Sequence, residues 1–213
     1  GSDFVEKRIF VHGSGHKAAS WDETISYMEN SGDALRPDLA AILNGKEATY
    51  ANLSACFAEY CNKIGEPVHL CGISLGGMLA LSYALDFPEK VKTLVLIGTP
   101  HKVPKIMFGI QNVIFKLLPK SAFAGMAFGK EDTFALGNSM KKWDVGDRAG
   151  NIQCRTLVVC GKKDSANLKS AYYFAEAVKH AQLRIMENAG HIVNEESPRA
   201  LAKLLDEFYC AQA

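Results

Sequence analysis

The sequence predicts an α/β fold with a mostly parallel sheet of about six strands flanked by helices. Short apolar runs alternate with longer segments of helical period, which is the order expected when each strand is followed by a crossover helix. The runs at 91–98 and 154–161 are almost continuously apolar after their first residues, as in strands that helices cover on both faces. The chain of 213 residues fits a single core of this kind.

The elements follow from these patterns in chain order. Strands are expected at 8–13, 34–37, 67–72, 91–98, 154–161 and 181–190, the second of them from the weakest pattern. Helices are expected around 21–30, 49–64, 77–87 and 197–209, the third of them ending before Pro88. The helix at 49–64 carries Leu53, Phe57, Tyr60 and Ile64 on one face, and Pro198 stands in the first turn of the last helix.

One segment departs from this alternation. Between Gly98 and Cys154 the pattern is apolar and helical, with no strand. A helical excursion of this kind in an α/β domain usually forms a lid over the active edge of the sheet. We therefore expect residues 1–100 and 151–213 to form one α/β core and residues 101–150 to form a helical lid insertion.

Composition excludes several classes of function. The chain is 48% hydrophobic and 22% charged with a net charge of +1 and no basic run, so nucleic acid and anionic membrane surfaces are not expected partners. No apolar run approaches the roughly 20 residues that span a bilayer, and no signal peptide is recognisable. The six cysteines form no CxxC pair, which favours buried free thiols over zinc or disulfides. These features predict a cytoplasmic protein without a metal or cofactor.

A candidate nucleophile lies between the third predicted strand and the helix after it. Gly72-Ile73-Ser74-Leu75-Gly76 fits G-x-S-x-G, and a serine in such a sharp strand-to-helix turn is held in a strained conformation that exposes its hydroxyl. Side chains at Gly72 and Gly76 would collide with the neighbouring strand and helix. The alternative is that Ser74 is only a small residue at a turn.

A catalytic serine needs a base and a carboxylate that orients the base. Asp164 follows the fifth predicted strand and His191 follows the last, where catalytic groups collect in open parallel sheets. Taken singly, Asp164 could be a turn residue and His191 could cap a loop. The order Ser74, Asp164, His191 at three strand ends favours a catalytic triad.

The stretch VHGSGH follows the first predicted strand. A turn there can supply a second backbone N–H to an oxyanion, from Ser14, beside the N–H of Leu75. We expect His12 to be structural and His16 to lie at the mouth of the pocket. The stretch lacks the Gly-Lys-Ser/Thr of a phosphate loop and the G-x-G-x-x-G of a dinucleotide site. A structural role is also expected for the three histidines His69, His101 and His180.

These blocks together resemble the α/β-hydrolase fold superfamily, in its small lidded serine esterase type. HGSG, GISLGG, LDFPEKVKTLVLIGTP, TLVVCGKKD and ENAGHIVNEESPRALAKLLDEF follow the family order over nearly the whole chain. The resemblance implies Ser74 as nucleophile, His191 as base, Asp164 as acid, and Ser14 and Leu75 as oxyanion donors. Only about seven residues precede the first strand, so we expect a trimmed N-terminal sheet edge that is exposed or covered by a partner.

The expected activity is cleavage of small or medium hydrophobic esters through an acyl-enzyme, by a monomer or homodimer. His16, Ile106, Ile110 and Phe115 are candidate substrate-binding residues. The alternative for the apolar stripe of the insertion is that it packs the lid on the body; the stripe comprises Ile106, Ile110, Val113, Ile114, Leu117 and Leu118. Rival activities on the same triad are thioesterase, acyltransferase, carbon–carbon bond hydrolase and perhydrolase. A non-catalytic receptor for a hydrophobic small molecule is a rival of another class.

Overall fold

The computed structural model describes residues 5–103, 113–114 and 116–211. Its centre is a six-stranded sheet in which all neighbouring strands are parallel, in the order β2-β1-β3-β4-β5-β6. The strands are β1 (Lys7–Val11), β2 (Asp33–Leu35), β3 (Val68–Ile73), β4 (Val91–Ile97), β5 (Arg155–Gly161) and β6 (Ala181–Met186). The predicted fold class is confirmed, and all six strands were expected close to these positions.

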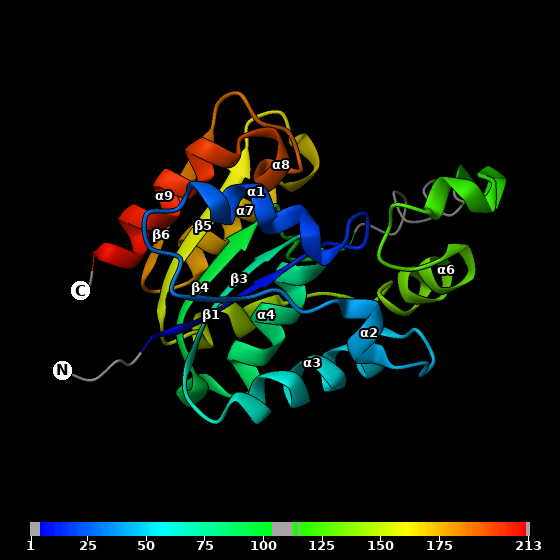
Figure 1. Cartoon of the computed structure of the whole chain (residues 1–213), viewed down its shortest axis with the longest axis horizontal. Coiled ribbons are helices and arrows are strands. Elements are labelled where there is room, and N and C mark those ends of the chain that lie inside the picture. The colour runs from blue at the N-terminus through cyan, green and yellow to red at the C-terminus, as the bar shows by residue number, and fades with distance from the viewer. Residues whose placement is uncertain (1–4, 104–112, 115, 212–213) are drawn as a thin grey trace.

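Helices separate the strands (Figure 1). The α-helices are α1 (Asp22–Tyr27), α2 (Leu39–Leu43), α3 (Tyr50–Ile64), α4 (Leu75–Asp86), α6 (Lys130–Ser139), α7 (Ser165–Ala177), α8 (Val193–Glu196) and α9 (Pro198–Cys210). The helix expected around 21–30 is shorter, because a 3-10 turn, η1 (Ala18–Trp21), precedes it and Met28 is already extended. The sequence patterns did not anticipate α2, α7 and α8.

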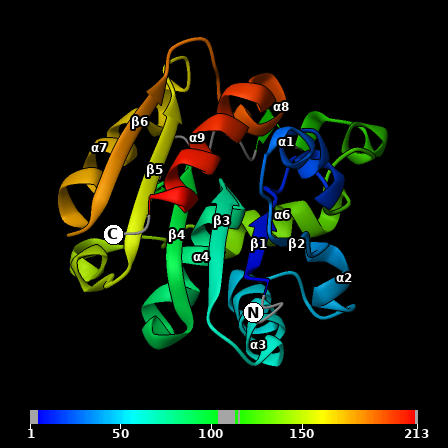
Figure 2. The ribbon, with the colours of Figure 1, turned by 60° about the vertical axis from the view of Figure 1, so that its left-hand side comes forward.

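The sheet has a hydrophobic core on each face. Along β4, Leu94 and Leu96 belong to one core while Val95 and Ile97 belong to the other. Helices α3, α4 and α7 contribute to the first core, and α1 and α9 cover the opposite face (Figure 2). The central strands are mostly apolar because both of their faces are buried, and their polar residues, such as Lys92 and Arg155, stand near the strand starts.

The described part of the insertion between β4 and β5 holds η3 (Lys120–Phe123), α6 and η4 (Gly146–Asn151), and no strand of the sheet. In Figure 1, α6 lies at the far side of the molecule from α9. The interpretation that the apolar stripe packs on the body is wrong for Val113, Ile114 and Leu117. These residues are 60%, 53% and 81% exposed. Later residues of the insertion, such as Phe128 and Leu136, make the contact with the core instead.

The sheet edge at β2 is short. This strand has three residues and pairs on one side only, with β1, where Lys7 forms an ion pair with Asp33. Among the residues from 5 to 211 that the structure describes, no helix combines the length and the apolar character needed to cross a membrane.

All six cysteines are free thiols. Four of them are buried, namely Cys56, Cys61, Cys71 and Cys160. Cys154 is only partly buried, and Cys210 is exposed at the end of α9. The expectation of buried thiols is therefore wrong for Cys210, because the last turn of α9 extends beyond the core that Phe208 and Tyr209 help to form.

Candidate active site

Ser74 occupies the turn between β3 and α4 in a backbone conformation that few residues other than glycine adopt, with φ 55° and ψ −118°. Its N–H donates to the carbonyl of Ile97 at 2.9 Å, and its own carbonyl accepts from the N–H of Met78 at 3.1 Å. The neighbouring strand and the first turn of α4 thus hold the strained residue in place.

Close approach of the backbone explains the glycines on both sides of Ser74. A Cβ on Gly72 would lie 2.2 Å from the carbonyl oxygen of Gly76, and a Cβ on Gly76 would lie 2.2 Å from that of Val11. These distances are well inside van der Waals contact, so the expected collision with the neighbouring strand and helix is confirmed.

Asp164 and His191 meet across the ends of β5 and β6. The ring nitrogen Nδ1 of His191 lies 2.7 Å from Oδ2 of Asp164, whose residue is only 7% exposed. With Nδ1–H donating to the carboxylate, Nε2 is the nitrogen of the ring that can accept a proton. The structure therefore brings two of the predicted catalytic residues into the relation that base and acid require.

The environment of Asp164 favours its charged form. Burial raises the pKa of the carboxyl, but hydrogen bonds from His191 and Asn167 outweigh this effect and bring the pKa below its ordinary value of 3.8. Asp164 is thus a carboxylate at neutral pH and can stabilise a positive charge on His191.

Asn167 is a residue of this site that sequence reasoning missed. Its amide nitrogen Nδ2 lies 3.1 Å from Oδ1 and 3.0 Å from Oδ2 of Asp164. Asp164 stands at the N-cap of α7, so the third residue of the helix comes back beside it. The sequence feature that could have identified Asn167 is its position as a polar residue three places after the candidate acid.

Replacing Asn167 with leucine, which has a similar shape, is expected to lower kcat about tenfold, the effect of losing one hydrogen bond to a charged group. The carboxylate would lose its second donor and hold His191 less firmly. Steady-state hydrolysis of a p-nitrophenyl ester checks this, with Asn151→Leu outside the cavity as the control. Unchanged turnover in Asn167→Leu would show that the Asn167 side chain is not needed to position Asp164.

Ser74 and His191 line the same cavity, of about 270 Å³. Ser14 and His16, both predicted to belong to the site, also line it, and Met126 contributes a side chain from the insertion. The full lining consists of Gly13, Ser14, Gly15, His16, Ser20, Ile73, Ser74, Met126, His191, Ile192 and Asn194. Three other candidates, Ile106, Ile110 and Phe115, lie outside the described residues.

His12 shapes the loop that carries the candidate oxyanion donor. The fully buried ring donates from Nδ1 to the carbonyl of Gly13 at 2.8 Å and accepts at Nε2 from the N–H of Leu39 at 3.1 Å. Burial lowers the pKa of His12, which favours this neutral form. Because the Gly13 carbonyl and the Ser14 N–H belong to one planar peptide, His12 also orients the N–H of Ser14.

The insertion is bonded to the same loop. The N–H of Ala127 donates to the carbonyl of Ser14 at 3.1 Å. Ser14 is thus held from both of its peptide units, by His12 on one side and by Ala127 on the other. Among the described residues, no backbone acceptor pairs with the N–H of Ser14 or of Leu75, so both N–H groups are available to an oxyanion.

Gly98, at the end of β4, is a second residue that sequence reasoning missed. Its φ is +50°, and a Cβ there would lie 3.0 Å from Nδ1 of His191 and 3.2 Å from Oδ2 of Asp164. Any side chain would press on the contact between base and acid. The sequence feature that could have identified Gly98 is its position directly after an apolar strand that neighbours the strand before Ser74.

The other histidines do not line the cavity. His69 is buried and hydrogen-bonded by Thr93 and Glu6 at the opposite end of the sheet, and His101 bonds Ser170. Within the described ranges, no three His, Cys, Asp or Glu side chains gather closely enough to hold a metal ion.

The sequence and the fold match a known family. A model of the alpha/beta hydrolase family covers residues 9–204. The chain belongs to this family. Solved structures agree: the alpha/beta hydrolase MGS-M2 from a deep-sea metagenome library has a TM-score of 0.84 at 18% identity, covering 100% of this chain and 92% of that one. A thermophilic esterase of Thermogutta terrifontis has a TM-score of 0.74 at 17% identity, covering 96% and 89%. Identities this low show a shared fold.

Curated relatives of this α/β-hydrolase bear the names of hydrolases. Monoacylglycerol lipase ABHD6 of Mus musculus is 24% identical over 71% of this chain, which spans 57% of the lipase's length. A 2-hydroxy-6-oxononadienedioate/2-hydroxy-6-oxononatrienedioate hydrolase of Comamonas testosteroni is 23% identical over 95% of this chain and 87% of its own. The two names describe different substrates, so similarity at this level does not select one.

Proposed function

We propose that this α/β-hydrolase is a serine hydrolase that cleaves carboxylic esters of small or medium hydrophobic acyl groups. The observation that carries the proposal is the 2.7 Å hydrogen bond between His191 and Asp164, beside a cavity that His191 shares with Ser74. Nucleophilic acyl transfer requires an activated serine, a base and a carboxylate that orients the base. The strained Ser74, His191 and the buried Asp164 are residues of these three kinds.

In the first step, the Ser74 oxygen attacks the ester carbonyl while Nε2 of His191 takes the hydroxyl proton. The carbonyl oxygen becomes an anion, which the N–H groups of Ser14 and Leu75 stabilise. The carbon–oxygen bond to the alcohol then breaks, and His191 gives its proton to the leaving oxygen. Asp164 stabilises the positive imidazolium throughout this step.

In the second step, water replaces the alcohol. His191 takes a proton from the water as the water oxygen attacks the acyl carbon of the acyl-enzyme. The bond to the Ser74 oxygen breaks, and the proton returns from His191 to that oxygen. The carboxylic acid leaves, and the enzyme is restored without a cofactor.

The cavity supports a small or medium acyl group. Its volume of about 270 Å³ lies just below the range for small-molecule sites, roughly 300–1,000 Å³. Ile73, Met126 and Ile192 supply apolar side chains to it. The proposal is also in keeping with relatives that include monoacylglycerol lipases, whose name denotes ester substrates.

Two measurements test the proposal. A fluorophosphonate probe is expected to label Ser74 in the folded protein, because it phosphonylates only an activated serine. Hydrolysis of p-nitrophenyl esters is expected to reach its highest kcat/KM between the acetate and the octanoate and to fall for the dodecanoate. Failure of the folded protein to label at Ser74 would contradict catalysis and favour a non-catalytic receptor.

A further inference from the structure

The backbone around the candidate base, His191, is held from two directions. On the β6 side, the carbonyl of Ala189 accepts from the N–H of Lys163 at 3.0 Å. This bond ties the chain before the base to the loop that carries Asp164. It ends two residues before His191, so the residues from 190 to 192 need a support of their own.

Glu196, the last residue of α8, supplies this support. The N–H of Ile192 donates to its Oε2 at 2.9 Å. Because the carbonyl of His191 and the N–H of Ile192 belong to one planar peptide, the bond orients the peptide that follows the base. Within the described part of the chain, the N–H groups of residues 190–192 donate no other hydrogen bond.

The same carboxylate also packs against the residue before the base. A Cβ placed on Gly190 would lie 3.1 Å from Oε1 and 3.3 Å from Oε2 of Glu196. The carbonyl oxygen of Gly190 lies against the end of β5, since a Cβ placed on Gly161 would lie 2.1 Å from it. The carboxylate of Glu196 thus meets the backbone on both sides of His191.

Helix α8, which carries Glu196, is anchored independently of this contact. Nδ2 of Asn194 donates to the carbonyl of Ser20 at 3.1 Å, and the carbonyl of Asn194 accepts from the Thr24 hydroxyl at 2.7 Å. These bonds join α8 to η1 and α1. A carboxylate on an anchored helix can determine where the loop of the base stands, whereas one on a free helix would follow the loop.

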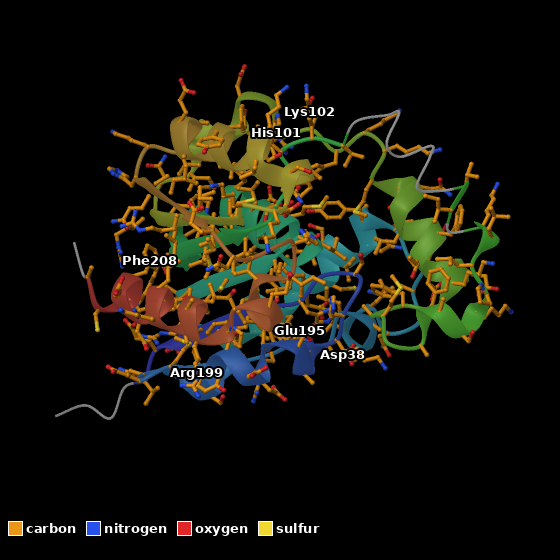
Figure 3. All side chains as sticks on the ribbon, turned by 90° about the horizontal axis from the view of Figure 1, so that it is seen from above. Asp38, His101, Lys102, Glu195, Arg199 and Phe208 are labelled. Atoms are coloured by element: carbon orange, nitrogen blue, oxygen red, sulfur yellow. The ribbon has the colours of Figure 1, made fainter. Side chains whose placement is uncertain are left out.

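The other glutamate of α8 has a different partner. Oε2 of Glu195, which is labelled in Figure 3, lies 3.3 Å from Nε2 of His16, on the loop of the proposed oxyanion donor. The two neighbouring carboxylates therefore contact two different loops of the site. The one that contacts the loop of the base is Glu196.

We propose that Glu196 is a positioning residue, whose carboxylate holds the Ile192 N–H and thereby keeps Nε2 of His191 within reach of the reacting oxygens. This role rests on the proposed function. The bond to Ile192 also closes the first turn of α8, as a helix cap does. A cap alone would affect the amount of folded protein and would act equally on all substrates.

Positioning of the base predicts unequal effects on two kinds of ester. In the proposed reaction, His191 gives a proton to the leaving oxygen. An alkoxide needs that proton, whereas p-nitrophenolate is a stable anion that leaves without one. A displaced His191 should therefore slow the cleavage of an alkyl ester more than that of a nitrophenyl ester.

Glu196→Met and Glu196→Gln form a matched pair for this test. Methionine keeps the length of the side chain but has no oxygen to accept from Ile192, whereas glutamine keeps a carbonyl oxygen. Glu196→Met is expected to lower kcat/KM about tenfold for ethyl butanoate and about twofold for p-nitrophenyl butanoate. Glu196→Gln is expected to stay within about twofold of wild type for both esters.

Glu187→Met is the control, because Glu187 is exposed in the same connection and bonds Lys162 at 2.8 Å instead of the loop of the base. It should leave both kcat/KM values at wild type. Glu196→Asp shortens the side chain by one methylene and should show the same inequality between the esters. This variant keeps the experiment decisive if Glu196→Met fails to fold.

Several outcomes would overturn the role of Glu196 alone, with Ser74 still labelled by the fluorophosphonate probe. They are no loss of activity in Glu196→Met, an equal loss for the two esters, or a Glu196→Gln variant as impaired as Glu196→Met. Absence of cleavage and of Ser74 labelling in the wild-type protein would overturn the proposed function and this role together.

Discussion

Replacing Ser74 with alanine is expected to lower ester turnover by about 10⁴-fold or more, because the proposed acyl-enzyme forms on the hydroxyl that this change removes. The variant should fold, since the backbone of alanine can make the same two hydrogen bonds, donating its N–H to the carbonyl of Ile97 and accepting from the N–H of Met78. Initial rates of p-nitrophenyl butanoate hydrolysis, with circular dichroism to verify folding, give the measurement. Wild-type turnover by Ser74→Ala would contradict the assignment of the nucleophile.

Ser74→Gly is the matched partner of this variant. Glycine adopts φ 55° and ψ −118° without the strain that a Cβ causes, so Ser74→Gly should be equally inactive but more stable than Ser74→Ala. We expect a difference of about 1 kcal/mol in the free energy of unfolding, measured in urea. Equal stability of the two variants would show that the turn stores no strain at this residue.

Asp164→Asn is expected to reduce turnover by about 10³- to 10⁴-fold while the protein remains folded. An amide can present its NH₂ group to Nδ1 of His191, which favours the tautomer with the proton on Nε2, where it cannot act as a base. The same ester assay measures the effect, and Asp147→Asn, an exposed change in η4, is the control. Turnover within a few-fold of wild type would remove Asp164 from the triad.

The same variant predicts a change in acid stability. Because folding lowers the pKa of Asp164, its charged form stabilises the native state above the ordinary value of 3.8, and this contribution is lost as the pH falls through the lowered pKa. The difference in unfolding free energy between wild type and Asp164→Asn should therefore be largest near neutral pH and shrink below about pH 4. A difference that is independent of pH would indicate an effect of shape rather than charge.

Much of the arrangement could be predicted because parallel strands end at one edge of a sheet. Placing Ser74, Asp164 and His191 directly after strands was enough to expect them at that edge, and the hydrogen bond between Asp164 and His191 lies there. The apolar runs likewise predicted strands buried on both faces. The catalytic roles of these residues stay predictions until the variants are measured.

Other features depend on distances that a sequence pattern does not contain. The contact of Asn167 with Asp164 depends on the helix that begins between them, and the tight space at Gly98 depends on two neighbouring strands. The stripe at Val113, Ile114 and Leu117 illustrates a different limit, because helical spacing identifies an apolar face without showing what covers it. The contacts of Asn194 were equally invisible, since its backbone carbonyl and its amide nitrogen bond Thr24 and Ser20, about 170 positions earlier in the chain.

The hydrogen bond from Ala127 to Ser14 connects the position of the insertion, which governs access to the cavity, with the loop of the proposed oxyanion donor. A displacement of the insertion large enough to break this bond would free the peptide after Ser14 and leave His12 alone to hold the peptide that carries the proposed oxyanion donor. The position of the insertion and the order of this donor would then be coupled through one residue. In an enzyme built this way, attack on a carbonyl would be fastest with the insertion bonded to Ser14, so the motion of a surface segment would affect the rate of each turnover.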